Sequence, residues 1–335
     1  MNVYCAQYKP IILTNIDSNT SNTGLQNILK ANGWLQEGEE ILSINKPGEG
    51  NMNVVLRVIT NKRTFILKQS RPYVRKYPDI AAPLNRIHTE YQFYRSVKDP
   101  LALARFPRIL AYDPSGYLMQ MEDLGDCRDM TYWYQTREIE QELLSGFIDI
   151  LSIIHTEETP ADYPENMELR QLNHLHIFVL PFMTDNGFLL DDVQPGLQQL
   201  SEPYKKNTAL KEIVTAIGNK YLSKGSVLLH GDYFPGSWMS RKNKVYVIDP
   251  EFSFIGFPEF DLGVMAAHAI MATSDKNYLN AILREYQGSP EESLVSQVAG
   301  IEIIRRLIGL AQLPLNRSLE EKDYLLRTAL QMILL

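Results

Sequence analysis

Two carboxylates in the second half of the chain are spaced so that a hairpin would bring them together. Asp232 follows an apolar strand that ends in "LLHG", and Asp249 follows the strand "VYVI" after an "RKNK" turn. Because side chains alternate along a strand, Val245, Val247 and Asp249 share one face. A tight turn at "RKNK" folds this strand back on "SWMS" as a hairpin. We therefore expect Asp249 to return towards the loop that carries Asp232.

Converging carboxylates repel one another unless a cation lies between them. Glu251 follows Asp249 by two positions and adds a third acid to the same place. A hard divalent ion suits such oxygen ligands, and Mg²⁺ prefers one or two carboxylates together with phosphate oxygens. We interpret Asp249 and Glu251 as Mg²⁺ ligands and Asp232 as a catalytic base that orients an attacking hydroxyl. The competing interpretation is that Asp232 and Asp249 only cap a helix or a turn.

A lysine in the first half of the chain suits the same chemistry. Lys68 ends the strand "RTFILK", on the same face as Ile66, and Glu90 lies on the following helical segment "PLNRIHTEYQFYRSV". A strand lysine paired with a helix glutamate holds ATP phosphates in kinase-type sites. We therefore expect Lys68 and Glu90 to form this pair, against the alternative that Lys68 is a solvated residue at a strand end.

Two further segments of the first half fit a nucleotide. The turn "PGEGNMN" contains Gly48 and Gly50, which let the backbone approach phosphates closely. With Asn51 beside them, we expect this turn to contribute to the nucleotide site, although glycines of this kind are common in hairpins. The segment "QMEDL" follows, and we expect adenine to bond to backbone groups of Glu122 and Leu124.

Periodicity predicts an α+β chain of two lobes. Short strands with turn signals between them predict a small antiparallel sheet with one helix over residues 1–124, of which residues 1–23 form a loose arm. After residue 124 helical patterns dominate, including one long helix over 201–225 and four more towards the end of the chain. The stretch "NHLHIF" (173–178), with His174 and His176, reads as extended. We expect residues 1–124 to bind the nucleotide and residues 125–335 to hold the catalytic groups and the substrate.

Composition limits the class of partner. The chain has 335 residues, a net charge of −7 and an isoelectric point near 5.5, which argue against nucleic acid or an anionic membrane as the main partner. Two cysteines are too few for a disulfide framework or a zinc cluster. The N-terminal residues do not resemble a signal peptide, and no apolar run reaches the length of a membrane span. We expect a cytoplasmic protein with a small-molecule substrate.

The ordered blocks "GEGNMN", "KQSRPYVR", "MEDL", "HGDYFPGS", "DPEFSFIGFPEFDLG" and "EIIRRLIGLA" resemble a known family. They are similar to the aminoglycoside phosphotransferase and choline kinase superfamily, a relative of protein kinases, and within it to the 5-methylthioribose kinases. The resemblance spans roughly residues 45 to 312 and implies a bilobal protein-kinase-like fold. It also implies ATP and Mg²⁺ as cofactors and transfer of the γ-phosphate to a hydroxyl of 5-methylthioribose in methionine salvage. A homodimer is implied by resemblance only.

The resemblance also assigns roles to single residues. Asp232 would be the catalytic base, and Lys68 would hold phosphates. Ser237 stands where the wider superfamily usually has a metal-ligating asparagine, and it would act beside Asp249 and Glu251. The pair Arg305 and Arg306 would lie near the sugar and its incoming phosphate, unless the two arginines are only an exposed helix face.

Other functions remain open on the sequence. "YFP" at 233–235 and the segment 170–182 depart from the family pattern, so the acceptor is open among other sugars, aminoglycosides, choline, amino alcohols and fructosamines. A different class of function is a nucleotide-binding protein of the same fold that transfers nothing. The presence of Lys68, Glu90, Asp232 and Asp249 argues against it.

Overall fold

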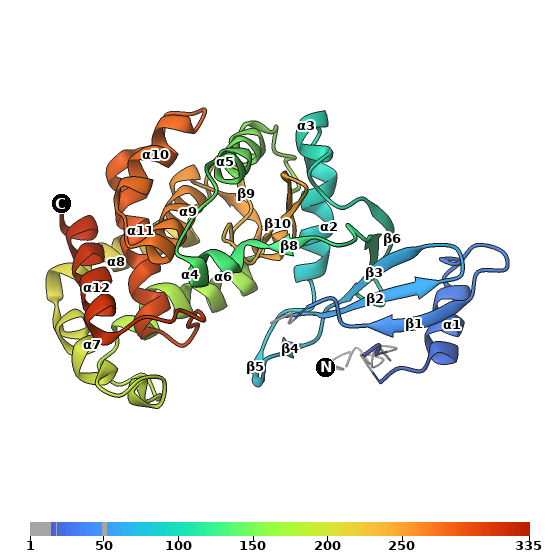
Figure 1. Cartoon of the computed structure of the whole chain (residues 1–335), viewed down its shortest axis with the longest axis horizontal. Helices are drawn as coiled ribbons and strands as arrows, with labels where there is room; N and C mark the ends of the chain where they lie inside the picture. The colour runs from blue at the N-terminus through green and yellow to red at the C-terminus, as the bar shows by residue number, and fades with distance from the viewer. Residues whose placement is uncertain (1–14, 18, 49–51) are drawn as a thin grey trace, which may run out of the picture. The chain divides into compact units, whose positions relative to one another are not determined.

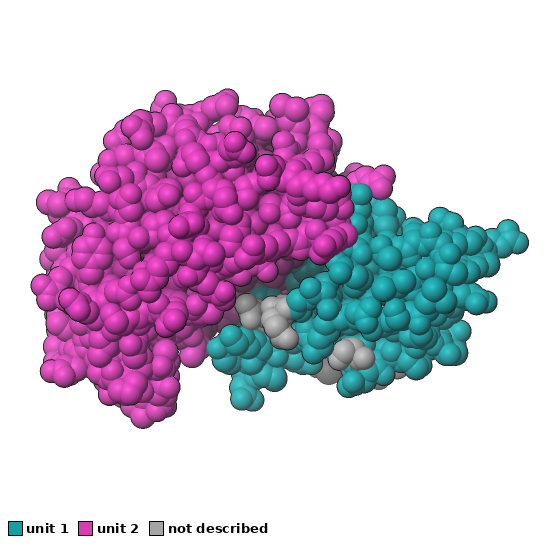
Figure 2. All heavy atoms as spheres, in the orientation of Figure 1, with its two compact units in different colours: residues 1–84, 109–123 teal, residues 85–108, 124–335 magenta. Residues whose placement is uncertain are grey.

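The structure is a computed structural model that describes residues 15–17, 19–48 and 52–335 (Figure 1). The predictions for Gly50 and Asn51 lie outside these residues. The chain divides into two compact units, coloured separately in Figure 2: residues 1–84 with 109–123, and residues 85–108 with 124–335. Residues 85–108 group with the second unit, although the sequence analysis placed them in the first lobe. A functional boundary after residue 124 stays a prediction.

Unit 1 is built on an antiparallel sheet of five strands with the spatial order β1-β2-β3-β7-β6. The small antiparallel sheet expected from the sequence is thereby confirmed. The helix and strands of this unit are α1 Asn22–Ala31, β1 Ile41–Asn45, β2 Val54–Thr60, β3 Thr64–Gln69, β4 Tyr73–Val74, β5 Tyr77–Ala81, β6 Ile109–Asp113 and β7 Leu118–Glu122.

One face of this sheet packs on helix α1. Alternate residues of the neighbouring strands β2 and β3 are buried on this face, including Leu56 and Val58 of β2 and Phe65 and Leu67 of β3. The buried residues of α1, Leu25 and Leu29, belong to the same core cluster. Because alternate side chains point to opposite faces, Lys68 lies on the sheet face away from α1.

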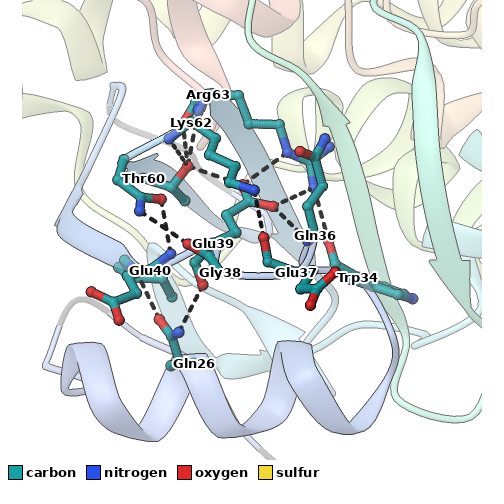
Figure 3. A network of polar contacts seen from close by, with 12 residues as sticks. Gln26, Trp34, Gln36, Glu37, Gly38, Glu39, Glu40, Thr60, Lys62 and Arg63 are labelled. Carbon is teal, nitrogen blue, oxygen red and sulfur yellow. Dashed lines mark hydrogen bonds and ion pairs between the residues drawn. The ribbon is translucent and has the colours of Figure 1, made fainter.

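A buried carboxylate ties the turn before β1 to the hairpin between β2 and β3 (Figure 3). Arg63 Nε lies 2.9 Å from Glu39 Oε1, and an Nη atom of Arg63 donates to the Trp34 carbonyl. Thr60 Oγ1 and the N–H of Gln36 also donate to the Glu39 carboxylate. Burial acts to raise the pKa of Glu39, but these hydrogen bonds outweigh it and lower the pKa below its ordinary value. The network fixes this edge of unit 1.

Unit 2 is mostly helical, as the sequence predicts. Its longer helices are α2 Arg86–Ser96, α5 Gln141–Thr156, α6 Met167–His174, α7 Leu197–Lys206, α8 Thr208–Leu222, α9 Pro258–Thr273, α10 Asn277–Glu285, α11 Glu292–Ile308 and α12 Leu319–Leu334. Shorter elements are α3 Pro100–Leu103, β8 Arg128–Asp129, α4 Trp133–Thr136, β9 Val227–Leu229, β10 Trp238–Arg241, β11 Lys244–Val247 and β12 Phe254–Gly256. Among the described residues, no helix is long and apolar enough to cross a membrane.

Two local predictions for unit 2 were wrong. The single helix expected over 201–225 is two helices, because Asn207 has extended backbone angles and its side chain accepts the N–H of Leu210 as the N-cap of α8. The stretch expected to be extended, 173–178, is helical: α6 runs to His174 and continues into one π-helical turn, Leu175–Val179. Its apolar residues Ile177 and Phe178 are buried on the helix rather than on a strand.

Candidate active site

The loop after β9 has a backbone shape that only glycine adopts easily. Gly231 has a φ of +84°, and a Cβ built there would lie 2.2 Å from the carbonyl oxygen of Phe252. A side chain at this position would therefore clash with backbone and strain the chain. This is the physical reason for the glycine between His230 and Asp232.

A buried aspartate holds the same loop in place. Asp261, in the first turn of α9, accepts the N–H of His230 at 2.7 Å and the N–H of Gly231 at 3.0 Å. His230 Nε2 donates to the carbonyl of Ile248 at 2.9 Å. His230 and Asp261 are both fully buried, and their hydrogen bonds brace the loop.

The predicted hairpin is confirmed, with β10 and β11 antiparallel and Trp238 opposite Val247. Its turn residues Lys242 and Asn243 both have positive φ, as a two-residue hairpin turn requires. The N–H of Ile248 donates to the carbonyl of Ser237 at 3.0 Å. Since His230 also bonds to Ile248, the residue before Asp249 is attached to both ends of the Asp232 loop.

The backbone at Asp249 is unusual. Its φ of 62° and ψ of 47° are left-handed, a conformation that costs a non-glycine residue energy and gathers at functional sites. Ser237 donates its hydroxyl hydrogen to the carbonyl of Asp232, at 3.1 Å, which leaves its oxygen lone pairs as acceptors. Ser237 directly precedes β10 and Asp249 follows β11 after one intervening residue, so both residues lie at the open end of the hairpin, and their role as ligands of a hard cation stays a prediction.

Glu251 already has a cationic partner within unit 2. Arg86 Nε lies 3.2 Å from Glu251 Oε2, and Arg86 is fully buried. Burial lowers the pKa of Arg86, while Glu251 and Glu90 raise it. No group of three or more His, Cys, Asp or Glu side chains is arranged to hold a metal within the described part of the chain. The metal role of Glu251 therefore stays a prediction.

The aromatic stretch 233–235, which departs from the family pattern, has a packing role. The hydroxyl of Tyr233 donates to the carbonyl of Phe147 at 2.7 Å, and the carbonyl of Pro235 accepts the N–H of Met130. The ring of Phe234 lies 5.1 Å from the guanidinium carbon of Arg306. Phe234 is thus a half-buried aromatic side chain two positions after Asp232 in the chain.

Both predicted arginines of α11 are buried, so they are no exposed helix face. Arg306 Nη2 lies 3.6 Å from Asp232 Oδ1. Burial raises the pKa of Asp232 to about 6, against Arg306 and Arg305, which lower it. Its side chain keeps 24% of its surface exposed, so a small molecule can reach the carboxylate.

A third residue of α11, which sequence reasoning missed, holds both arginines. Glu302 accepts the Nε hydrogens of Arg305 and Arg306, the latter at 2.8 Å. Burial acts to raise the pKa of Glu302, but the two arginines hold it well below its ordinary value. The spacing of Glu302, three and four positions before the two arginines, could have predicted these ion pairs, because residues three and four positions apart share a helix face.

The expected nucleotide residues fall in both units. In unit 1, Lys68 is buried on β3 opposite Val55 and Met119 of its neighbouring strands, and Glu122 ends β7. Gly48 is exposed before the undescribed residues 49–51. Glu90, on α2, and Leu124 belong to unit 2, so the Lys68–Glu90 pair stays a prediction. The carbonyl of Leu124 accepts from Arg241 at 2.6 Å.

A protein-family model matches most of the chain. The family model described as "Phosphotransferase enzyme family", APH, matches residues 43–295. Curated relatives include methylthioribose kinase 1 of Oryza sativa subsp. japonica, which is 24% identical over 70% of this chain and 57% of its own length. The methylthioribose kinase of Geobacillus sp. is 26% identical over 87% of this chain and 84% of its own length. The chain thus spans little more than half of the rice relative.

Solved structures share the fold. A spectinomycin phosphotransferase in complex with ADP and spectinomycin superposes with a TM-score of 0.53 at 13% identity, over 94% of this chain and 99% of that one. A choline kinase from Streptococcus pneumoniae gives 0.51 at 14% identity, over 92% and 98%. The protein-kinase-like fold expected from the sequence is confirmed by these matches.

Proposed function

This chain belongs to the phosphotransferase enzyme family, and on that premise we propose that it transfers the γ-phosphate of ATP to a hydroxyl group of a small molecule. The observation that carries the proposal is the partly exposed carboxylate of Asp232, held by a braced loop with Arg306 3.6 Å away. A carboxylate that accepts the hydroxyl proton, next to a cation that meets the incoming phosphate, is the arrangement this reaction uses.

The proposed acceptor is 5-methylthioribose, phosphorylated in methionine salvage. Support comes from relatives named methylthioribose kinase, which are 24% and 26% identical to this chain in the two proteins described above. Arg305 and Arg306 would contact the sugar and the phosphate that reaches it. The stretch 233–235, which contains Phe234, is more aromatic than the family pattern beside the proposed base. Other acceptors should therefore be tested as well.

The proposed cofactors are ATP and Mg²⁺. Lys68, Glu90 and the turn with Gly48, Gly50 and Asn51 would hold the phosphates, and backbone groups of Glu122 and Leu124 would meet the adenine. Asp249, Ser237 and Glu251 would provide oxygen ligands. When bound, Mg²⁺ would neutralise the charge of the phosphates. The residues themselves position the acceptor hydroxyl and take its proton at Asp232.

Three further expectations belong to this proposal: a cytoplasmic location, a possible homodimer and no macromolecular substrate. A kinase for an aminoglycoside, choline, a fructosamine or another sugar is the nearest alternative. The solved structures of a spectinomycin phosphotransferase and a choline kinase, which share the fold, are the reason to consider this alternative. A protein that binds nucleotide without transfer is the alternative from another class.

The test is a coupled assay of ADP release over thiosugars, other sugars, amino alcohols and aminoglycosides, each with ATP and Mg²⁺. We expect 5-methylthioribose to give the highest kcat/KM. Turnover of an amino alcohol or an aminoglycoside alone would replace the acceptor but keep the reaction. ATP binding without release of ADP on any acceptor would overturn the proposed reaction.

A further inference from the structure

A chain of buried hydrogen bonds links three helices of unit 2 behind the two arginines. The hydroxyl of Tyr134, on α4, lies 2.6 Å from Nδ1 of His268, on α9. His268 Nε2 lies 3.0 Å from Glu302 Oε1, on α11. Tyr134, His268 and Glu302 are each at most 1% exposed, so solvent does not compete for these bonds.

The direction of each hydrogen bond follows from chemistry. An ionised carboxylate only accepts, so His268 donates Nε2–H to Glu302. Nδ1 of a neutral imidazole is then an acceptor, and the hydroxyl of Tyr134 donates to it. Burial lowers the pKa of His268 to about 4, which keeps the ring neutral in this arrangement. The tautomer of His268 is thus set by Tyr134 and Glu302 together.

The two arginines differ in the number of N–H donors that are left without a protein acceptor. Both give Nε–H to Glu302, and Arg306 also donates to the carbonyl of Ala311 and faces Asp232. The Nη atoms of Arg305 make no hydrogen bond to any residue that the structure describes, although Arg305 is only 5% exposed. These Nη atoms are not enclosed by protein atoms, so their N–H donors are open to solvent or to an anionic ligand.

We propose that Glu302, oriented by His268 and Tyr134, is a positioning residue that turns Arg305 towards an anionic ligand and Arg306 towards Asp232. This division of roles rests on the proposed phosphotransfer function and deepens it. One carboxylate fixes both guanidinium planes by their Nε edges, which leaves the Nη edges of Arg305 for phosphate oxygens. The ring of Phe234 lies 5.1 Å from the ring of His268 and 5.1 Å from the guanidinium carbon of Arg306, so it packs beside both side chains.

The charge balance of the cluster agrees with this role. Arg305 and Arg306 bring two positive charges, and Glu302 and Asp232 bring two negative ones, while His268 is neutral. Without Glu302, two adjacent buried cations would repel each other and lose their common acceptor. The carboxylate of Glu302 therefore stabilises the two arginines and also fixes the orientation of their guanidinium groups. No residue of the cluster is contributed by unit 1.

The mildest test removes only the phenolic hydroxyl. We expect Tyr134→Phe to lower kcat/KM for the phosphate acceptor roughly 3- to 10-fold, the worth of one buried hydrogen bond, and to leave the KM for ATP within about two-fold. Tyr132→Phe is the matched control, because its hydroxyl donates to Glu140 and belongs to no part of the site. Equal losses in both variants, or a loss shared by the KM for ATP, would contradict the positioning role.

Two substitutions of His268 separate orientation from packing. His268→Gln keeps a side-chain N–H for Glu302, whereas His268→Leu removes it at similar bulk. We expect the glutamine variant to retain most of the acceptor kcat/KM and the leucine variant to lose about 10- to 100-fold, as for a hydrogen bond to a charged group. If both variants behave alike after correction for folded fraction, His268 is only a packing residue.

An acceptor-independent measurement keeps this inference separate from the proposed function. Histidine ¹⁵N spectra should show His268 as the neutral Nε2–H tautomer in wild type and a changed tautomer balance in Tyr134→Phe. Inorganic phosphate should raise the unfolding temperature of wild type, with the rise lost in Arg305→Leu and reduced in Tyr134→Phe. If no acceptor is turned over but these results hold, the proposed function fails and the positioning role stands. A different tautomer, or a phosphate effect that Arg305→Leu leaves unchanged, overturns the positioning role whatever the assay shows.

Discussion

Arg306 Nη2 lies 3.6 Å from Asp232 Oδ1, so a buried cation of α11 faces the carboxylate of the loop after β9. The two residues are 74 positions apart in the sequence and belong to the same compact unit. The distance is longer than a hydrogen bond, so the carboxylate keeps its capacity to accept a proton from a substrate. This relationship is the basis of the first prediction.

Asp232→Ala removes the proposed base. We expect kcat to fall by about 10²–10⁴, the usual contribution of a general base, because the acceptor hydroxyl loses its proton acceptor. ATP binding, measured by calorimetry, should stay nearly unchanged. Asp162→Ala changes an exposed aspartate of the same unit and should have wild-type kinetics. Near wild-type transfer by Asp232→Ala would show that another group performs this step.

The two candidate carboxylate ligands should respond differently to Mg²⁺. Asp249→Asn should raise the Mg²⁺ concentration for half-maximal activity more than Glu251→Gln does, because Arg86 already balances the charge of Glu251. We expect about a ten-fold or larger difference between the two variants, equal to at least about 1.4 kcal/mol. Activity titrated with MgCl₂ gives the comparison, with Glu168→Gln as an exposed control. The opposite order would make Glu251 the principal ligand.

Gly231→Ala should destabilise unit 2 and impair the Asp232 loop. Alanine in the left-handed region costs about 1–2 kcal/mol, and the close approach of the Phe252 carbonyl adds to that cost. Gly187→Ala is the matched control, since its φ is +82° but no atom lies within 4 Å of the added Cβ. Urea unfolding should give the larger loss for Gly231→Ala. Equal losses would mean that the loop moves to accept a side chain.

His268 should make the stability of the protein depend on pH. Burial lowers its pKa to about 4 in the folded protein, against 6.5 for an ordinary histidine. Between these values the unfolded chain binds one more proton, so this contribution is full above pH 6.5 and is lost as the pH falls towards 4. The slope from this group approaches 1.4 kcal/mol per pH unit. Its neighbours Tyr134, Glu302, Arg305 and Arg306 set the remaining balance of charge.

The measurement compares urea unfolding of wild type and His268→Gln between pH 7.5 and 4.5. Because glutamine does not titrate, the difference in free energy of unfolding should shrink as the pH falls below 6.5. A constant difference over this range would show that His268 has an ordinary pKa or is protonated in the folded state.

Glu39→Gln should weaken the network in unit 1 that Figure 3 shows. The change removes the charge that Arg63, Thr60 and the Gln36 N–H all meet, and we expect a loss of about 1–3 kcal/mol in the free energy of unfolding. Glu40→Gln alters the exposed neighbour and should change stability little. Identical urea midpoints for both variants would mean that the ion pair adds nothing to stability.

Predictions from the sequence were most accurate where a single local pattern of residues was enough to indicate the structure. Strand alternation and the "RKNK" turn predicted the β10–β11 hairpin, and Ile248, which bonds to Ser237 and His230, shows that the hairpin does return Asp249 to the Asp232 loop. Helical periodicity predicted α9 to α12. It failed over 201–225, where a single asparagine side chain competes with the helix backbone.

The amino-acid sequence by itself determined the fold class, the family blocks and the hairpin, because strand alternation, helical periodicity, turn residues and motifs are patterns of residues close in the chain. Only the tertiary structure decided what surrounds Arg306. Tyr134, His268 and Glu302 come from three helices, and their order in the sequence carries no record that one hydrogen-bonded chain joins them. Such a chain forms because buried polar groups must find partners wherever the packing of helices brings them.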